Sequence, residues 1–257
     1  MSQFGYLISL MTWSYSRLRA YEDCGYRFFL KYIQEEKECE HFYSEYGSMM
    51  HRILERFYSG KITKEQALGE YMSGFVLRVP QEVKPNVSEG WYEQGKEYLS
   101  SLAMPEEKII GVEERLDFQI GGYPFIGYVD LLLEDGGLII EDHKSRILQA
   151  KSYVKNTKTE RKNNEEFDRF AKQLYIYSAG IEQKYGELPK EIRFNCFRSG
   201  KVLIEKFDKE KYKEAKTWAI NTIRRIEQES EWEPAPDWFR CKYICGLTET
   251  CDIAQLL

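Results

Sequence analysis

The sequence contains no long hydrophobic run. No stretch of its 257 residues approaches the roughly 20 apolar residues that a membrane-spanning helix needs. The N-terminal segment YLISLMTW (6–13) is shorter than that, and no basic residue precedes it, so it does not resemble a signal peptide. We therefore expect an intracellular, cytoplasmic protein with no membrane partner.

Positive charge is also in short supply. Lys and Arg number 37 against 42 Asp and Glu, and the resulting net charge of −5 argues against a general nucleic-acid binder. The exception is a local basic segment (146–162) in which Glu160 is the only acidic residue. Its basic residues are Arg146, Lys151, Lys155, Lys158, Arg161 and Lys162. Taken alone, this segment is as consistent with a solvated, mobile loop as with a DNA contact.

Cysteine is scarce, yet three of the six cysteines lie in the tail segment FRCKYICGLTETC (239–251). In a reducing compartment, clustered cysteines more often bind a metal or take part in chemistry than form structural disulfides. Cys241, Cys245 and Cys251 do not by themselves complete a four-coordinate site. If they bind a metal, a fourth ligand must come from a distant part of the chain.

The chain has neither internal repeats nor low-complexity tracts, and its hydrophobic content of 42% is enough for a sizeable core. Apolar periodicity predicts helices over 14–33, 46–58, 64–77, 88–102, 165–185 and 208–229. Strand patterns between turn signals cover 108–120, 123–133, 138–144, 191–197 and 201–207. We expect an irregular tail after Pro234. This order of elements predicts an α/β fold with a mixed central β-sheet flanked by helices.

The segment GYVDLLLEDGGLIIEDHKS (127–145) places charged residues within two apolar runs. Apolar flanks predict buried strands, where an ionised carboxylate costs several kcal/mol unless it is paired or bound to a metal. Asp142 and Lys144 are two residues apart, so they share one face of their strand. If residues 135–137 form a three-residue hairpin loop, the register places Asp130 opposite Asp142.

Two carboxylates placed in this way, with Cβ atoms about 4.5–5.5 Å apart, repel each other unless a cation lies between them. A hard divalent ion such as Mg²⁺ suits oxygen ligands, lowers the pKa of a bound water and neutralises phosphate charge. The Lys144 ammonium can orient that water or stabilise developing charge. The combination favours phosphodiester hydrolysis. The alternative is a buried salt bridge between Asp142 and Lys144, with Asp130 hydrogen-bonded elsewhere.

Asp130 followed by Asp142-His143-Lys144 resembles the motif of the PD-(D/E)xK nucleases, and more narrowly their RecB-like branch. This branch includes the CRISPR-associated RecB-like exonucleases and the nuclease module of AddB. Its further signatures follow in order. They are a cysteine-bearing helix SYSRLRAYEDCGYRFFLKYI (14–33), a histidine helix GSMMHRILE (47–55), a Q-x-x-x-Y helix QLYIYS (173–178) and the C-terminal cysteine triplet.

The resemblance spans residues 14–251 and implies a single nuclease domain over 1–257 with a restriction-endonuclease-like core. Within it we expect a helical N-terminal part (1–105), the nuclease core (106–207), and a C-terminal helix with a cluster-binding tail (208–257).

The resemblance also implies a metal site for Mg²⁺ or Mn²⁺. Its ligands are His51, Asp130, Asp142 and the backbone carbonyl of His143, with Lys144 as the third catalytic residue beside the two aspartates. Judged alone, a histidine at the edge of an apolar helix such as His51 is more often a core residue than a ligand.

Other residues take supporting roles in this interpretation. Gln173 and Tyr177 are four residues apart and share a helix face, and the resemblance implies that they contact DNA or the catalytic lysine. Glu113 and Glu114 lie in the strand before Asp130, where the resembling family often has a glutamate. The sequence does not show which of the two matches, so both are weak candidates for a supporting role beside the metal ligands. The basic segment directly follows the catalytic lysine, so we expect DNA contacts from Arg146, Lys155, Lys158, Arg161 and Lys162.

In the resembling family, Cys24 would join Cys241, Cys245 and Cys251 to hold a [4Fe–4S] cluster, which would tie the chain ends together. The spacing C-x3-C-x5-C has one residue more than the family's usual C-x2-C, and a bulged turn near Ile244 must absorb it. Tetrahedral Zn²⁺ and free thiols are the alternatives. Cys39 and Cys196 fit no spacing, and we expect a surface and a core residue.

Together these features predict a metal-dependent DNA exonuclease that acts on single-stranded ends. The resemblance implies a role in CRISPR adaptation, an antiviral defence, where the enzyme trims spacer precursors alongside integrase proteins. A phage nuclease or a recombination and repair nuclease of the same branch is the alternative. A catalytically silent DNA-binding scaffold is a rival of a different class, and the complete set His51, Asp130, Asp142 and Lys144 argues against it.

Overall fold

The computed structural model describes residues 4–155 and 157–256. The N-terminal helices are α1 (Gly5–Ser9), α2 (Tyr15–Asp23), α3 (Gly25–Phe28) with a π-helical turn (Phe29–Ile33), α4 (Phe42–Tyr58), α5 (Lys64–Arg78) and α6 (Pro85–Ser100). The strands are β1 (Lys108–Ile120), β2 (Tyr123–Glu134), β3 (Leu138–His143), β4 (Glu191–Cys196) and β5 (Lys201–Lys206). The remaining helices are α7 (Lys158–Tyr185), α8 (Lys209–Gln228), α9 (Trp238–Tyr243) and α10 (Asp252–Gln255).

The five strands form one mixed sheet in the order β1-β2-β3-β4-β5, which confirms the predicted fold class. β3 and β4 run parallel, and the other neighbours are antiparallel. Loop 135–137 has the three residues expected, and Glu134 pairs with Leu138. Gly136 and Gly137 have φ values of 57° and 147°, which glycine adopts far more readily than other residues.

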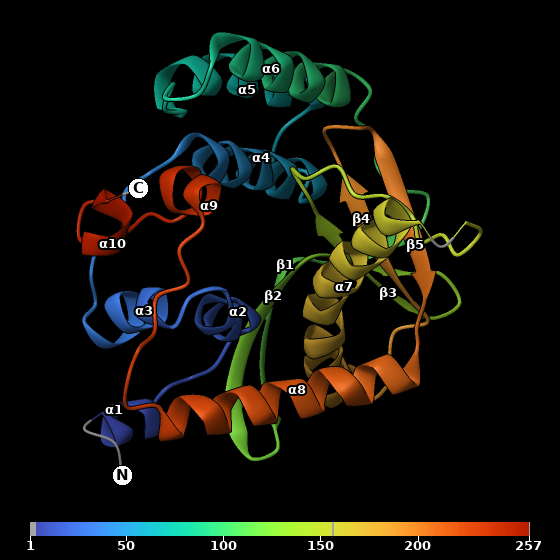
Figure 1. Ribbon diagram of the computed structural model, residues 1–257. Coiled ribbons are helices and arrows are strands. Elements are labelled where there is room, and N and C mark those ends of the chain that lie inside the picture. The colour runs from blue at the N-terminus through green and yellow to red at the C-terminus, as the bar shows by residue number, and fades with distance from the viewer. Residues whose placement is uncertain (1–3, 156, 257) are drawn as a thin grey trace.

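The central strands are covered on both faces, as their continuous apolar runs predict. Leu131, Leu133 and Ile139 pack in one buried cluster with residues of α4, α5 and α6. Leu132 and Ile140 belong to a second cluster with α7 and α8. Figure 1 shows α4 to α6 stacked above the sheet, α7 crossing its strands and α8 running along the bottom. Even-numbered residues of β3 therefore face α7, whereas the first half of β2 presents odd-numbered residues such as Phe125 and Val129 to the same cluster.

The segment predicted as one helix over 14–33 is broken at Cys24. This residue is extended (φ −169°, ψ 113°), and its thiol accepts a hydrogen bond from the backbone N–H of Arg27 at the start of α3. The break turns the thiol toward the C-terminal tail: its sulfur also accepts from the N–H of Ala235, 3.4 Å away. The helical periodicity of the sequence does not predict this break.

Helix α7 begins at Lys158, earlier than predicted, because Thr157 and Glu160 form a capping box. The Glu160 N–H donates to Thr157 Oγ1 (3.1 Å), and the Thr157 N–H donates to Glu160 Oε2 (2.9 Å). The sequence T-x-x-E carries this signal. The second half of the basic segment is therefore helical, so the alternative of a mobile loop does not hold for residues 158–162.

The N-terminal helices α2 and α3 lie next to the tail that carries α9 and α10, at the left of Figure 1. The N–H of Tyr26 donates to the carbonyl of Glu233 (3.2 Å), and the N–H of Cys39 donates to that of Gly246 (2.5 Å). The prediction of an irregular tail after Pro234 is wrong in part, because the tail contains the short helices α9 and α10. No helix in the described ranges is long and apolar enough to cross a membrane.

Candidate active site

Asp130 lies where β2 and β3 stop pairing. The ladder runs from the hairpin to Leu131 and Glu141, and one further pair would bring Asp130 level with Asp142. Instead, Asp130 Oδ2 accepts a hydrogen bond from the backbone N–H of His143 (2.6 Å). Burial raises the pKa of Asp130, but His51 and this N–H more than offset burial and hold the pKa below its ordinary value.

His51 reaches this position from α4. Its Nδ1 atom is 3.5 Å from Asp130 Oδ1 and 3.9 Å from Glu113 Oε1. Its Nε2 atom is 3.0 Å from the backbone carbonyl oxygen of His143. Burial lowers the pKa of His51, yet Asp130 and Glu113 raise it to about 10. The surroundings of this ring therefore favour a positive charge.

The structure separates Glu113 from Glu114. Glu113 lies between the β1–β2 pairs that flank Asp130, and its φ of 50° is left-handed, a conformation that costs a non-glycine residue roughly 1–2 kcal/mol. The donor atoms of His51, Glu113 and Asp130 all lie within 4.8 Å of one another. Glu114 instead accepts hydrogen bonds from Lys184 (2.5 Å) and the Tyr185 hydroxyl (2.7 Å).

Asp142 and Lys144 share a strand face, as predicted, with Lys144 Nζ 2.6 Å from Asp142 Oδ2. Asp142 Oδ2 is buried, and this ion pair with Lys144 is the only polar contact that it makes with the described residues. Burial raises the pKa of Asp142 against the pull of Lys144, and the nearby Asp130 charge raises it further. A buried carboxylate whose one partner is an ammonium, next to the second carboxylate of Asp130, fits a divalent metal ligand.

The alternative to a metal site is a buried salt bridge between Asp142 and Lys144, with Asp130 hydrogen-bonded elsewhere. Both of these contacts are present. That alternative does not account for the convergence of His51 and Glu113 on Asp130, or for the strained backbone of Glu113. Strained backbone is concentrated at functional sites because the surrounding fold must hold it in place. The residues present therefore fit a divalent cation better than a simple ion pair.

Gln173 and Tyr177 hold the lysine. Lys144 Nζ donates to Gln173 Oε1 (3.1 Å), and Gln173 Nε2 donates to the Tyr177 hydroxyl (3.3 Å). Tyr177 is buried, and a Cβ at Gly127 would lie 2.6 Å from its ring, so glycine makes room for this side chain. Of the two contacts that the resemblance implies, the geometry favours the one to Lys144 over the one to DNA.

The His143 ring lies on the opposite face of the sheet, as its position between Asp142 and Lys144 requires. It stacks on Tyr58 with ring centroids 5.6 Å apart. Neither ring nitrogen has a hydrogen-bond partner among the described residues, and burial lowers the pKa of His143 to about 4. The His143 ring lies beside that of His51, with ring centroids 6.0 Å apart, while the backbone N–H and carbonyl of His143 contact Asp130 and His51.

The structure brings the four predicted cysteines together. Cys24, Cys241, Cys245 and Cys251 line one small cavity of about 20 Å³ between α3 and the tail. Ile244, the residue expected to absorb the extra spacing, leaves the helical conformation at the end of α9 (φ −120°, ψ −37°).

The two remaining cysteines lie elsewhere. Cys196 is a core residue, as expected, whereas Cys39 is partly buried rather than fully on the surface. Cys39 lies next to the tail through its bond to Gly246 but does not line the cysteine cavity.

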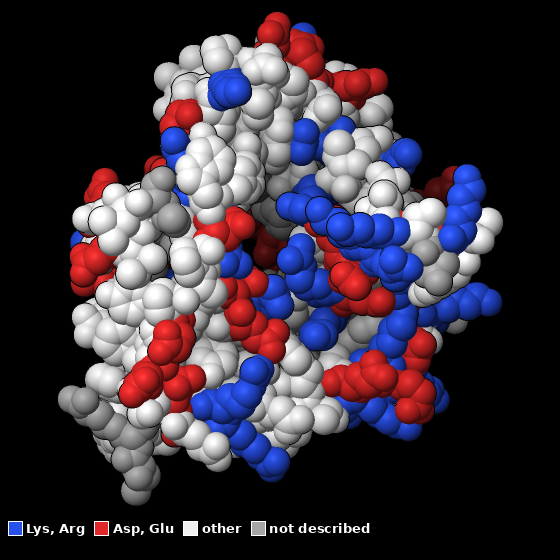
Figure 2. Space-filling view, in the orientation of Figure 1, with Lys and Arg blue, Asp and Glu red and all other residues white. Residues whose placement is uncertain are grey.

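The basic segment divides into structural and exposed residues. Lys151 forms ion pairs with Asp168 and Glu205, and Arg146 pairs with Glu166. Arg146 is nevertheless exposed to solvent, as are Lys155, Lys158, Arg161 and Lys162. Figure 2 shows Lys and Arg side chains gathered over α7, along one side of a central hollow.

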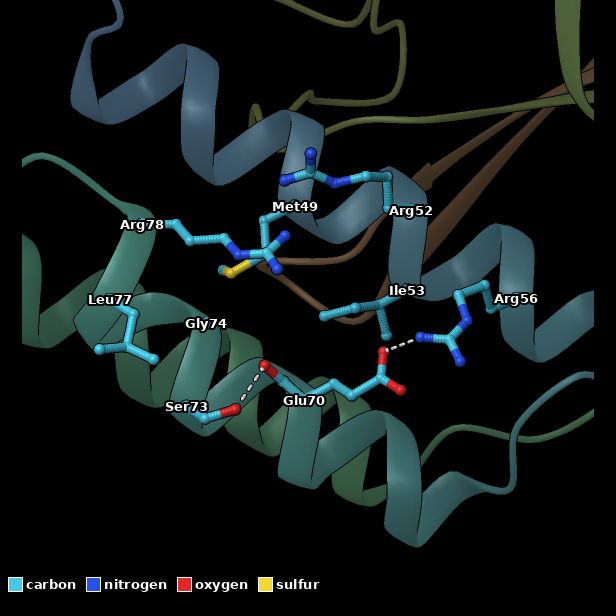
Figure 3. Close-up of a pocket in the computed structure, with 9 residues that line it drawn as sticks. All are labelled: Met49, Arg52, Ile53, Arg56, Glu70, Ser73, Gly74, Leu77 and Arg78. Atoms are coloured by element: carbon cyan, nitrogen blue, oxygen red, sulfur yellow. Dashed lines mark hydrogen bonds and ion pairs between the residues drawn. The ribbon is translucent and has the colours of Figure 1, made fainter.

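A separate groove of about 260 Å³ lies between α4 and α5 (Figure 3). Three guanidinium groups line it, and the Arg56 group pairs with Glu70 at 2.6 Å. The groove uses the α4 residues that face α5, whereas His51 faces the sheet. This groove is therefore separate from the candidate active site.

The mixed sheet with flanking helices, and the cluster of carboxylates, histidine and lysine at its edge, define the class of protein as an α/β nuclease fold. The model of the PD-(D/E)XK nuclease superfamily matches residues 12–252, and the chain belongs to this superfamily. The search of curated proteins found no match.

Two solved structures give further comparisons. A protein from Eubacterium rectale, described as a candidate exonuclease, is 16% identical, with 93% of this chain and 86% of that chain covered and a TM-score of 0.56. At this identity the likeness shows the fold alone. A protein designated SSO0001 is 14% identical, with 93% and 95% covered, but its TM-score of 0.31 carries no argument.

The different positions of the two glutamates give a direct test of the metal site. We expect Glu113→Gln to weaken Mn²⁺ binding at least about tenfold, since it removes one of three converging charged or imidazole donors. Glu114→Gln is the matched control, because Glu114 bonds to α7 instead. Isothermal titration calorimetry measures both variants, and equal losses of affinity would show that Glu113 has no special place in the site.

Proposed function

We propose that this protein is a metal-dependent deoxyribonuclease of the RecB-like branch, an exonuclease that hydrolyses phosphodiester bonds at single-stranded DNA ends. The observation that carries the proposal is the cluster of His51, Glu113 and Asp130, which lies beside the buried pair of Asp142 and Lys144. These are nitrogen and oxygen donors of the kind that Mg²⁺ and Mn²⁺ accept.

In this proposal the ion is held by His51, Asp130, Asp142 and the His143 carbonyl, and Glu113 is added as a fifth candidate. The bound ion supplies an activated water and neutralises charge on the phosphate. Lys144 places its ammonium where it orients the attacking water or stabilises the developing charge. Asp142 and Gln173 fix the position of that ammonium from two sides.

We also propose that the four cysteines hold a [4Fe–4S] cluster. The proposal is supported by the four thiols lining one cavity between α3 and the tail, although Cys24 is more than two hundred residues from the other three. Tetrahedral Zn²⁺ bound by the same four thiolates stays the alternative.

The cluster would join the break after α2 to the tail and so close a loop of more than two hundred residues. By analogy with a disulfide, closing such a loop stabilises the fold by several kcal/mol through the unfolded state. It would also fix α9 beside α4. Its role is thus structural, since it holds the tail against the rest of the nuclease.

The biological setting follows from the resemblance. We propose that the enzyme acts in the cytoplasm and trims spacer precursors in CRISPR adaptation, together with integrase proteins. A phage nuclease or a recombination and repair nuclease of the same branch would use the same site. The intact set of His51, Asp130, Asp142 and Lys144 supports an active enzyme over a silent DNA-binding scaffold.

The catalytic assignment predicts the effect of two substitutions. Asp130→Ala and Lys144→Ala should each lower the Mn²⁺-dependent degradation of linear single-stranded DNA by about 100-fold or more. Circular dichroism should show both variants folded. Glu114→Ala, which alters the same sheet away from the cluster, should keep wild-type rates. Nuclease rates that stay at the wild-type level in both active-site variants would show that the site is misplaced.

The exposed basic residues predict a change in salt dependence. Neutralising Lys155, Lys158, Arg161 and Lys162 to Gln should weaken single-stranded DNA binding and reduce its salt slope by up to about 0.7 per lost phosphate contact. The control neutralises the exposed lysines Lys201, Lys206, Lys209 and Lys213 on β5 and α8. Fluorescence anisotropy across a salt series measures both. If the two quadruple variants show the same slope, these α7 residues do not contact the DNA backbone.

The cluster predicts that anaerobically purified protein is brown and contains close to four iron atoms per chain. Cys24→Ala should lose that iron and lower the melting temperature, whereas Cys39→Ala should keep both, since Cys39 lies outside the cavity. Zn²⁺ would give a colourless protein with about one zinc per chain and the same sensitivity to Cys24. Full iron retention in Cys24→Ala would show that the fourth ligand is misassigned.

A further inference from the structure

A groove of about 430 Å³ opens directly beside the catalytic lysine. This volume is in the range of small-ligand pockets, roughly 300–1,000 Å³. Its walls come from α4, α6, α7, α9 and the segments that follow β3 and β4. The residues that line it are Tyr43, Ser44, Trp91, Lys144, Ser145, Arg146, Phe170, Arg198, Phe239 and Ile244, of which four are aromatic and three basic.

Arg198 is a charged group without a counter-ion in this groove. Its guanidinium donates to Gln94 Oε1 (2.9 Å) and to the Ser145 carbonyl (3.3 Å), both neutral acceptors. Among the ion pairs of residues 4–155 and 157–256, none involves Arg198, although Lys144 and Arg146 each have an acidic partner. Burial lowers the pKa of Arg198, as expected for a cation that is partly withdrawn from water without a carboxylate.

Arg198 is nevertheless held firmly. Its guanidinium lies 3.5 Å from the centre of the Trp91 ring, a cation–π contact, while Gln94 fixes it from the same helix. A guanidinium that is held in place and lacks an acidic partner is suited to bind phosphate, because its planar donors match two phosphate oxygens. Arg198 is therefore placed to pair with an anion, such as a phosphate group, that enters the groove from outside.

The aromatic walls suit the rest of a nucleotide. Phe239 on α9 is 46% exposed, which leaves much of its ring open to the groove. Tyr43 lies near it, with ring centroids 5.9 Å apart, and Phe170 lies on the far side beside Lys144, 5.2 Å from its ammonium. Flat aromatic faces bind unpaired bases by stacking, and they do so with little regard to sequence.

We propose that this groove is the subsite for the unpaired nucleotide next to the scissile phosphate. Arg198 binds its phosphate, and Phe239 with Tyr43 stacks on its base. The assignment rests on the proposed function, because Lys144 marks the reacting end of the groove. A base within a duplex is stacked and paired, so this subsite selects single-stranded DNA by requiring a base that is free to stack.

The subsite also gives the C-terminal tail a part in substrate binding. Phe239 lies two residues before Cys241, so whatever fixes the cysteine cavity also fixes this ring. The control for Phe239 is on the same short helix. Trp238 is 53% exposed, packs against Tyr243 and does not line the groove.

The test measures the binding of oligothymidylate, and of the same strand with abasic linkers, by fluorescence anisotropy in EDTA. Metal is absent, so the result does not depend on the nuclease reaction. Wild-type protein should bind the normal strand about tenfold more tightly than the abasic strand, the scale of one stacked base. Phe239→Ala should lose most of this difference, while Phe239→Tyr and Trp238→Ala should keep it.

Arg198 has a separate signature. Arg198→Ala should weaken the binding of both strands and lower the salt slope by about 0.7, since it removes one phosphate contact. Arg78→Ala removes a charge from the groove between α4 and α5 and should leave the slope unchanged. Circular dichroism confirms that each variant is folded.

The outcomes distinguish a failure of the proposed subsite from a failure of the proposed nuclease reaction. If wild-type protein degrades single-stranded DNA but binds normal and abasic strands equally, the subsite is wrong and the nuclease assignment stands. If Phe239→Ala discriminates as well as wild type, the stacking role is wrong. If the protein discriminates between the strands but shows no hydrolysis with any divalent ion, the subsite holds and the proposed reaction fails.

Discussion

The carboxylates of Asp130 and Asp142 lie at the edge of a buried sheet, where burial alone favours their neutral forms. The fold compensates with positive or partly positive groups from three directions: His51 from α4, the His143 N–H from β3 and Lys144 from the following turn. Negative charge therefore persists in a place that is poor in water, and it attracts a cation. The packing of α4 on one sheet face and α7 on the other brings these groups to one point.

The same arrangement explains why the site lies where it does. β2 and β3 separate just beyond Leu131 and Glu141, so Asp130 exchanges a ladder partner for the His143 N–H. Gly127 leaves room for Tyr177, and the bonds from Tyr177 through Gln173 end at Lys144. The cysteine-bearing tail contributes Phe239 and Ile244 to the wall of the groove beside Lys144.

Much of this could be predicted from local pattern. Two apolar runs around a three-residue turn set the strand register, so the common face of Asp142 and Lys144 follows from counting. Local pattern does not predict features that depend on tertiary contacts. The left-handed backbone that separates Glu113 from Glu114 has no signal in the sequence, and the break at Cys24 is hidden within an otherwise helical pattern. The early start of α7 has a local signal in the sequence, the capping box of Thr157 and Glu160. Arg198 and Phe239 come from separate segments that only the fold brings together.

The central claim is that the buried carboxylates hold a divalent metal ion for DNA hydrolysis. Anomalous diffraction at the manganese edge, from crystals grown with Mn²⁺, tests it most directly. The account predicts a manganese peak in contact with His51, Asp130 and Asp142, at oxygen distances near those of octahedral divalent ions, about 2.0–2.2 Å. A protein that cleaves DNA with Mn²⁺ while its crystals show manganese only elsewhere would contradict the account.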